Sequence, residues 1–364
     1  MHPNKMHTRS LVKPDGREIH LYSRSQISTG SALGPPRVVP GSHFRWHPLR
    51  GEWVAYASHR QNRTFLPPPD WNPLRPSDDP AHLTELPVGD YEVAVFDNLF
   101  PTLSADPGAL PPTSIVATDR GLGAAEVVVF TQDPQGSLGR LTVDHMALIF
   151  EVWADRTRAL GARQPIAYVM PFENRGAEVG VTLNHPHGQI YAFPFIPPIP
   201  ARELAESLAH FRAHGRGLLK DHIEAELADG RRTLYASESA AAFVPVCARY
   251  AYEVWVAPRR PIPDFAALTA SERVELARAL KTVLLKYDGL WGRPFPYVMV
   301  IHQAPTDGAE HPEAHLHIEL YPPYRMAGRL KYLAGCELGA GMFTADTLPE
   351  DKAAELRAVE VSLD

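Results

Sequence analysis

Two alternating histidine pairs are the residues of this chain best suited to chemistry. They stand in residues 185–189 (His-Pro-His-Gly-Gln) and residues 315–319 (His-Leu-His-Ile-Glu). On a strand, residues two apart face the same side, so each pair would present two imidazoles together. Three roles fit the first pair: two metal ligands, two core histidines bonded to backbone groups, or a nucleophile with Gln189 donating to a substrate oxygen.

The residues after His187 favour the third role. Gly188 has no side chain, so a ligand can approach the backbone closely. Gln189 supplies a neutral donor on the same face, which suits a phosphoryl oxygen. A neutral imidazole is a good nucleophile, and its ordinary pKa near 6.5 leaves it mostly neutral at pH 7. Because imidazole is also a good leaving group from phosphorus, these residues indicate a double displacement through His187.

The helix and strand that are expected to position each pair occur twice in the sequence. Residues 141–163 carry apolar side chains at helical spacing and precede a Tyr-Val-Met strand at 168–170. Residues 268–289 repeat the helical pattern, opened by a capping box of Thr269 and Glu272, and precede Tyr-Val-Met at 297–299. The two copies are offset by roughly 130 residues, which indicates duplicated structural units. The sequence therefore predicts an α+β fold made by tandem duplication of two halves, each a sheet with packed helices.

Composition narrows the classes of function. The chain has 364 residues, 21% of them charged, and a net charge of −6, which gives no reason to expect nucleic acid as a partner. Cys247 and Cys336 are the only cysteines, too few for a disulfide framework, and they favour a reducing cytoplasm. No apolar run approaches the ~20 residues of a membrane span, and residues 1–25 do not resemble a signal peptide. We therefore expect a cytoplasmic protein without a membrane partner.

The segment from Asn184 to Ala192 resembles the active-site strand of galactose-1-phosphate uridylyltransferases, members of the histidine-triad superfamily. Residues 172–180 precede it with the family's spacing, and residues 53–63 resemble the family's N-terminal nucleotide-binding stretch. Residues 302–305 and 320–323 match the C-terminal half of the family. The resemblance implies two histidine-triad-like halves, each an antiparallel sheet with packed helices. The expected division is an N-terminal arm (1–42), an N-terminal catalytic half (43–200) and a C-terminal half that binds metal and hexose (201–364).

The resemblance also implies a ping-pong reaction. His187 would attack the α-phosphorus of UDP-glucose and expel glucose 1-phosphate, and galactose 1-phosphate would then discharge the uridylyl-histidine as UDP-galactose. Gln189 would stabilise the non-bridging phosphate oxygens in both steps. Other functions stay open: a nucleoside-diphosphate-hexose phosphorylase or adenylyltransferase of the same superfamily, or a nucleotide- or metal-binding protein without activity. By the same resemblance we expect a homodimer.

Further positions match substrate-binding residues of the family. At the phosphates and the nucleoside they are Arg60, Arg63, Asn98, Asn174, Gly180 and Thr182, and at the hexose Lys331 and Glu337. Arg60 and Arg63 could clamp phosphate oxygens with planar guanidinium groups, although outside this context they would be two solvated surface charges. Leu99 and Cys336 depart from the family, where an acidic residue and a tyrosine are usual. Base and hexose preference are therefore open.

One metal site of the family is lost in this sequence. The family's zinc site uses a Cys-x-x-Cys pair, a distant histidine and the first histidine of the active-site pair. Here Asn72, Arg75 and Pro134 stand in place of three ligands, and only His185 is retained. Because structural zinc needs four ligands, this zinc is predicted to be absent.

The second metal site of the family uses a glutamate and three histidines. Glu203, His302 and His317 match three of its ligands, and Glu319 stands in place of the fourth. Since carboxylates and imidazoles both bind zinc and iron(II), these four residues could hold one metal ion. The alternative is a hydrogen-bonded His–Glu cluster that supports the C-terminal sheet. His311 and His315, nearby in sequence, match no ligand.

Overall fold

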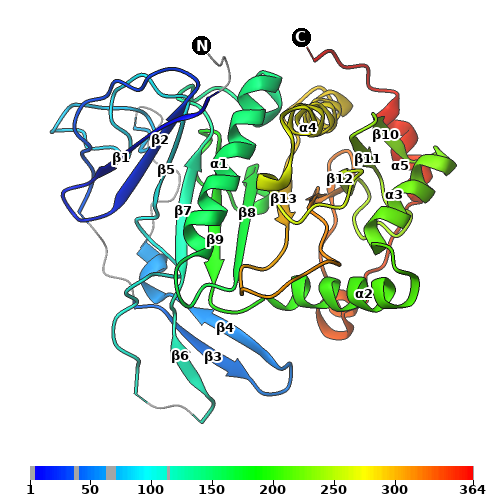
Figure 1. Cartoon of the computed structure of the whole chain (residues 1–364), viewed down its shortest axis with the longest axis horizontal. Helices are drawn as coiled ribbons and strands as arrows, with labels where there is room; N and C mark the ends of the chain where they lie inside the picture. Colours follow the sequence, from blue (N-terminus) through cyan, green and yellow to red (C-terminus); the bar gives the residue numbers. More distant parts are fainter. Residues whose placement is uncertain (1–4, 37–40, 63–70, 113–114, 364) are drawn as a thin grey trace.

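One antiparallel sheet of 11 strands runs through the whole molecule. The structure is a computed structural model that describes residues 5–36, 41–62, 71–112 and 115–363 (Figure 1). In spatial order the strands are β1 (His7–Val12), β2 (Glu18–Ser23), β5 (Val93–Asp97), β7 (Ala124–Val129), β9 (His187–Phe193), β8 (Tyr168–Arg175), β13 (Tyr297–His302), β14 (His317–Tyr321), β12 (Val254–Pro258), β11 (Ala240–Phe243) and β10 (Thr233–Ala236).

The order of strands confirms the predicted duplication. From the centre outward, the first half reads β8, β9, β7 and β5, and the second half reads β13, β14, β12 and β11. The halves meet where β8 pairs with β13, with Met299 opposite Glu173. The sequence predicts a sheet in each half but not that the two sheets join edge to edge. This junction places the second histidine of each pair in the same sheet, since His187 begins β9 and His317 begins β14.

The two predicted helices cover one face of this sheet. They are α1 (Val143–Gly161) and α4 (Ala270–Leu290), and α4 begins with the predicted capping box of Thr269 and Glu272. Buried side chains of both helices, among them Trp153 and Leu280, belong to one hydrophobic core. Because such burial is the main favourable term in folding, the core stabilises the two halves as a single unit.

Smaller elements complete the chain. The remaining elements are β3 (His43–His47), β4 (Glu52–Tyr56), β6 (Thr118–Arg120), β15 (Tyr324–Met326), β16 (Arg329–Leu330), α2 (Pro198–His214), α3 (Leu218–Asp229), α5 (Pro349–Arg357), four short 3-10 turns and a π-helical turn (Cys336–Ala340). β3, β4 and β6 form a small sheet that projects from the body (Figure 1). A turn at residues 14–16 leads into β2, and the hairpin of β1 and β2 extends the large sheet through β5. Among the described residues, no helix is long and apolar enough to cross a membrane.

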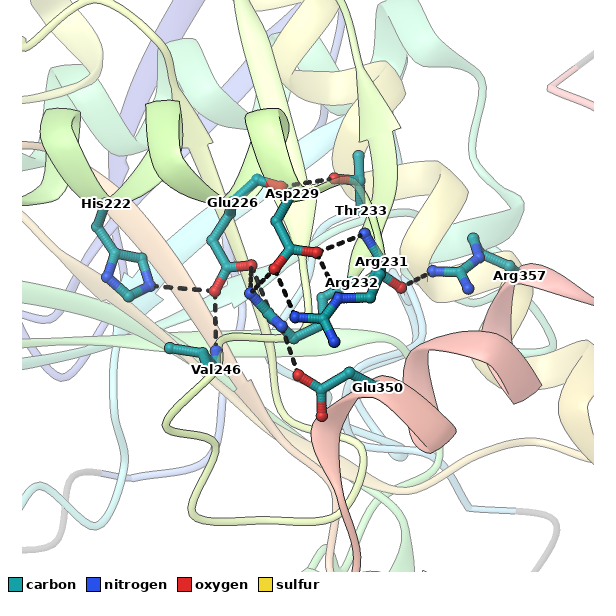
Figure 2. A network of polar contacts seen from close by, with 9 residues as sticks. All are labelled: His222, Glu226, Asp229, Arg231, Arg232, Thr233, Val246, Glu350 and Arg357. Carbon is teal, nitrogen blue, oxygen red and sulfur yellow. Dashed lines mark hydrogen bonds and ion pairs between the residues drawn. The ribbon is translucent and has the colours of Figure 1, made fainter.

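A network of paired charges attaches the C-terminal helix α5 to the second half (Figure 2). The buried carboxylate of Glu226 accepts hydrogen bonds from Arg232 Nε and Val246 N, each at 2.8 Å. Arg232 also pairs with Asp229 at 3.2 Å and with Glu350 on α5. Because each buried charge has a hydrogen-bonded partner of opposite sign, the network avoids the cost of an unpaired ion.

Candidate active site

His187 is the first residue of β9, and its ring has a fixed orientation. Nδ1 lies 2.7 Å from the backbone carbonyl of His185. Since a carbonyl can only accept, Nδ1 carries the hydrogen and Nε2 carries the lone pair. Burial lowers the pKa of His187, although the hydrogen bond to the carbonyl acts in the opposite direction. The ring is therefore a neutral imidazole at neutral pH, with its nucleophilic nitrogen left free by the described residues.

His185 has a different environment from His187. It lies in a bend before β9 rather than in the strand, and it is buried. Nε2 donates to the Thr131 carbonyl at 2.7 Å, and Nδ1 accepts from the Asn72 side-chain amide at 3.0 Å. Strand alternation therefore does not govern this pair: both ring nitrogens of His185 are occupied, and only His187 offers one to a ligand.

Asn72, at a position that the resemblance assigns to a zinc ligand, makes two hydrogen bonds. Asn72 donates to His185 and accepts from the backbone N–H of Leu74 at 2.9 Å, which closes a local turn. Arg75 is exposed, and Pro134 lines a pocket beside the histidines. The amide of Asn72 thus orients the imidazole that a metal would otherwise hold. The absence of zinc here stays a prediction.

A pocket of about 160 Å³ lies beside His187 and collects several predicted site residues. Its polar lining includes Arg60, Asn98, Thr182 and Gln189, and its apolar lining includes Leu99. Gln189 Oε1 lies 3.4 Å from the amide nitrogen of Asn98, which leaves the Gln189 NH₂ group as a donor toward a ligand. Arg63 lies outside the described residues.

Arg60 is positioned by residues that the sequence analysis missed. Nη1 donates to Thr102 Oγ1 at 2.6 Å and lies 3.2 Å from Tyr191 Oη on β9. Nε and Nη2 of the guanidinium group make no hydrogen bond to the part of the chain that the structure describes, so they remain for a ligand. Thr102 and Tyr191 are ordinary polar residues far apart in sequence, so no pattern in the chain indicates this cluster.

A second pocket of about 330 Å³ shares Leu183 and His187 with the first and is lined by Asn174. Gly180 lies in the loop that leads to Thr182, and its φ of 81° is a left-handed conformation that favours glycine. Two concave surfaces therefore meet at the nucleophilic ring. Such an arrangement can hold two parts of one substrate on either side of a reacting atom.

The interpretation of Gly188 was wrong. A Cβ at this position would lie 2.7 Å from Phe130 Cζ and 2.7 Å from the Phe172 carbonyl oxygen. Gly188 is buried, whereas its neighbours His187 and Gln189 are partly exposed. A side chain at position 188 would therefore point to the opposite face of β9. Glycine is required here by protein packing and not by the approach of a ligand.

Lys331 and Glu337 belong to a separate loop near the C-terminus. The Glu337 carboxylate accepts from Ala334 N at 3.1 Å, Thr344 Oγ1 at 2.8 Å and Lys331 Nζ at 3.3 Å. Neither residue is among those that line the two pockets at His187. Cys336 is partly exposed. Within one described chain, the predicted hexose loop is therefore not part of the surface around the nucleophile.

The four predicted metal ligands come together in the second half. Glu203 lies on α2, His302 ends β13, and His317 and Glu319 lie on β14. One ligand atom from each lies within 4.8 Å of all the others. His302 Nδ1 is 2.6 Å from Glu203 Oε2, yet it is a buried nitrogen without a hydrogen bond of acceptable geometry. This unsatisfied nitrogen fits a metal ligand better than a member of a hydrogen-bonded cluster.

Two hydrogen bonds are the same in both histidine pairs, although His315 Nδ1 lacks a partner that corresponds to Asn72 among the described residues. His317 Nδ1 donates to the His315 carbonyl at 2.8 Å, as His187 does to that of His185. His315 Nε2 donates to the Pro258 carbonyl at 2.8 Å, as His185 does to that of Thr131. Burial would lower the pKa of His317, but its neighbour Glu319 raises it to about 9. His311 pairs with Asp307 and Glu313 and takes no part in the metal group.

Comparison with known proteins gives matches over most of the chain. Two family models match the chain: the galactose-1-phosphate uridyl transferase N-terminal domain over residues 37–197 and the C-terminal domain over residues 203–363. The chain is 34% identical over 330 residues to a galactose-1-phosphate uridylyltransferase of Thermotoga maritima, covering 88% of this chain and 99% of the relative. It is 36% identical over 328 residues to that of Streptomyces lividans, covering 85% and 86%. A solved uridylyltransferase structure superimposes with a TM-score of 0.76 at 32% identity, covering 87% of this chain and 98% of the other.

Proposed function

This chain belongs to the galactose-1-phosphate uridylyltransferase family, and from that premise we propose that it moves a uridylyl group from UDP-glucose to galactose 1-phosphate through His187. The observation that carries the proposal is the free Nε2 of a neutral His187 where two pockets meet. The donor NH₂ of Gln189 in the same pocket suits a phosphoryl oxygen.

The reaction has two balanced displacements. In the first, the Nε2 lone pair of His187 forms a bond to the α-phosphorus, and the bond from that phosphorus to the glucose 1-phosphate oxygen breaks with its electron pair. In the second, a phosphate oxygen of galactose 1-phosphate attacks the same phosphorus, and the ring leaves as neutral imidazole. The hydrogen bond from Nδ1 to the His185 carbonyl stabilises the positive charge that the ring carries between the two steps.

This reaction gives each predicted binding residue a contact with the substrate. Arg60 and Thr182 would contact phosphate oxygens and Asn98 the uridine, since all three line the pocket beside Gln189. Asn174 would contact the phosphates from the second pocket, with Gly180 shaping the loop beside it. Arg63, outside the described residues, would contact phosphate oxygens by its match to the family.

The hexose contacts require a second copy of the chain. Lys331 and Glu337 match the family's hexose loop but do not line the pockets at His187 of their own chain. A homodimer in which each chain brings this loop to the other's His187 would complete the site. The oligomeric state in solution and the KM for galactose 1-phosphate in Lys331→Met test this part.

We also propose one zinc or iron ion held by Glu203, His302, His317 and Glu319. Two imidazoles and two carboxylates are donors that both metals accept, and a bound cation would use the unsatisfied Nδ1 of His302. Metal analysis of the purified protein should give about one equivalent, and Glu203→Gln should reduce it, with a lower melting temperature. Wild-type protein that is equally stable and metal-free would contradict the site.

A single-turnover experiment tests the reaction. Stoichiometric protein mixed with UDP-glucose alone should release about one equivalent of glucose 1-phosphate and gain the mass of a uridylyl group at His187. Adding galactose 1-phosphate should discharge the adduct as UDP-galactose. His187→Gly should abolish the burst, whereas the control His82→Gly, which removes an exposed histidine, should keep it.

The same assay separates the alternatives. Sustained turnover with inorganic phosphate as the acceptor would favour a phosphorylase, and a burst with ADP-glucose but not UDP-glucose an adenylyltransferase. No burst with any nucleotide sugar would refute the catalytic role of His187.

A further inference from the structure

Glu85 is a buried carboxylate that borders the pocket beside His187 and has no part in the reaction described above. Glu85 is 5% exposed, and among the described residues it is the only carboxylate that lines this pocket. Leu74, Phe96 and Leu99 provide apolar walls in the same pocket. A buried acid in a largely apolar pocket is costly unless its oxygens are hydrogen-bonded, so its partners indicate what the pocket binds.

One oxygen of Glu85 is held by the N-terminal hairpin. Oε2 accepts from Lys13 Nζ and, at 3.0 Å, from Arg17 Nη1. Lys13 is 2% exposed and lies 4.4 Å from the centre of the Phe96 ring. Two buried cations on one oxygen fix the orientation of the carboxylate, because turning it would leave both unpaired.

The charges around Glu85 balance. Arg17 also pairs with Asp15 at 2.7 Å, so the group contains two cations and two carboxylates. The pocket therefore presents no net negative charge that would repel a nucleotide. Glu85 can act as a local hydrogen-bond acceptor without opposing a phosphate.

The other oxygen, Oε1, accepts no hydrogen bond from any residue that the structure describes. With Oε2 turned toward Lys13 and Arg17, Oε1 is the atom left for a ligand. Apolar walls suit a flat base, and an unpaired acceptor beside them requires a neutral N–H or O–H donor. We infer that Glu85 Oε1 accepts a hydrogen bond from the nucleoside of the bound nucleotide, either from a ribose hydroxyl or from the imide N–H of uracil.

This inference rests on the proposed function for the identity of the nucleotide, and it makes Glu85 a residue that determines specificity. A site built to bond a hydroxyl or N–H group rejects an analogue without it, because the buried acceptor then stays unpaired. A hydrogen bond to a charged group is typically strong enough for a loss of about tenfold or more in affinity.

Binding of unreactive nucleotides tests the contact without turnover. Dissociation constants would be measured by calorimetry for UDP, 2′-deoxy-UDP, 3′-deoxy-UDP and N3-methyl-UDP. Wild-type protein should bind at least one analogue about tenfold or more weakly than UDP, and the affected analogue identifies the donor. In Glu85→Gln the amide oxygen stays with the donors Lys13 and Arg17, and the NH₂ group, which cannot accept, replaces Oε1. This variant should therefore bind UDP as weakly as wild type binds that analogue, with no further loss for the analogue itself.

Matched variants separate the contact from folding. Glu18→Gln removes a half-exposed carboxylate outside this pocket and should keep the wild-type ranking. If Glu85→Gln does not fold, the double variant Lys13→Met with Glu85→Gln would be used in its place, because it removes one charge of each sign. The melting temperature of each variant would be measured to show that it is folded.

Each outcome is decisive. Equal binding of UDP and all analogues by wild type, no binding of UDP, or unchanged discrimination in the Glu85 variants would overturn the inference. A uridylyl burst without this discrimination would refute the Glu85 contact alone. Discrimination without a burst would leave the contact in place and refute the proposed reaction.

Discussion

Replacing Asn72 with alanine tests whether a hydrogen bond has taken over the task of a metal ligand. The side chain makes two bonds, one to the buried Nδ1 of His185 at 3.0 Å and one from Leu74 N at 2.9 Å. Each bond contributes about 0.5–1.5 kcal/mol net, and leaving His185 Nδ1 unpaired costs about 1–3 kcal/mol. We therefore expect Asn72→Ala to lower the free energy of unfolding by about 2 kcal/mol.

The same substitution should reduce the rate of the first displacement. His187 Nδ1 is held by the carbonyl of His185, so a displaced His185 backbone would misalign the nucleophile. Since small misplacements of reacting groups are costly, we expect about a tenfold slower burst with little change in affinity for UDP-glucose.

Urea unfolding and rapid-quench measurement of glucose 1-phosphate would give these two quantities. Arg75→Ala, three residues along the same loop and exposed, is the matched control and should behave as wild type. A wild-type urea midpoint and burst rate in Asn72→Ala would refute the reasoning. Restoration of the variant by added zinc would also refute it, because the position would then still be a metal site.

Three further predictions follow from burial on the neighbouring strands β8 and β9. Because burial lowers the pKa of His187 below 6.5, the burst rate should fall in acidic buffer with a midpoint below pH 6.5. A midpoint above 6.5 in single-turnover assays would contradict this. Gly188→Ala should destabilise the protein by about 1–3 kcal/mol in urea unfolding, since the added methyl group meets Phe130 and a backbone carbonyl that cannot move aside. Burial raises the pKa of Glu173 from 4.5 to about 7, so its contribution to stability is lost as pH rises through 7. Glu173→Gln, whose amide oxygen can still accept from Tyr297, should therefore gain up to about 3 kcal/mol over wild type between pH 5 and pH 8, and parallel stability curves would contradict it.

The fold was predictable because its signals are periodic and repeated. The helical patterns at 141–163 and 268–289 became α1 and α4 within two residues, and the spacing of the histidine pairs gave the duplication. The edge pairing of β8 with β13 was not predictable, since neither strand's own sequence specifies which edge of the other half it meets. The packing role of Gly188 was also missed, because the sequence does not reveal that Phe130 and Phe172 fill the space beside it.

Residues that match family motifs could be proposed from the sequence, whereas residues that match no motif, such as Glu85, could not. The four members of the metal group come from three elements, and family spacing identified all of them. Glu85 lies in a loop without regular structure, and its partners Lys13 and Arg17 lie about 70 residues earlier in the chain. Only the folded sheet, which brings the N-terminal hairpin beside β5, shows that this carboxylate borders the pocket.

The two halves show how one neighbour decides what the same imidazole can do. His187 and His317 have the same tautomer, fixed by a carbonyl two residues earlier. Two positions further along each strand stands Gln189 in the first half and Glu319 in the second. The neutral amide leaves His187 with a lowered pKa and a free lone pair, whereas the carboxylate raises the pKa of His317 to about 9. Without a cation beside it His317 would hold a proton on the nitrogen that a nucleophile needs. Under the proposed function, a change from amide to carboxylate would therefore separate the histidine used for covalent chemistry from the one assigned to the metal group.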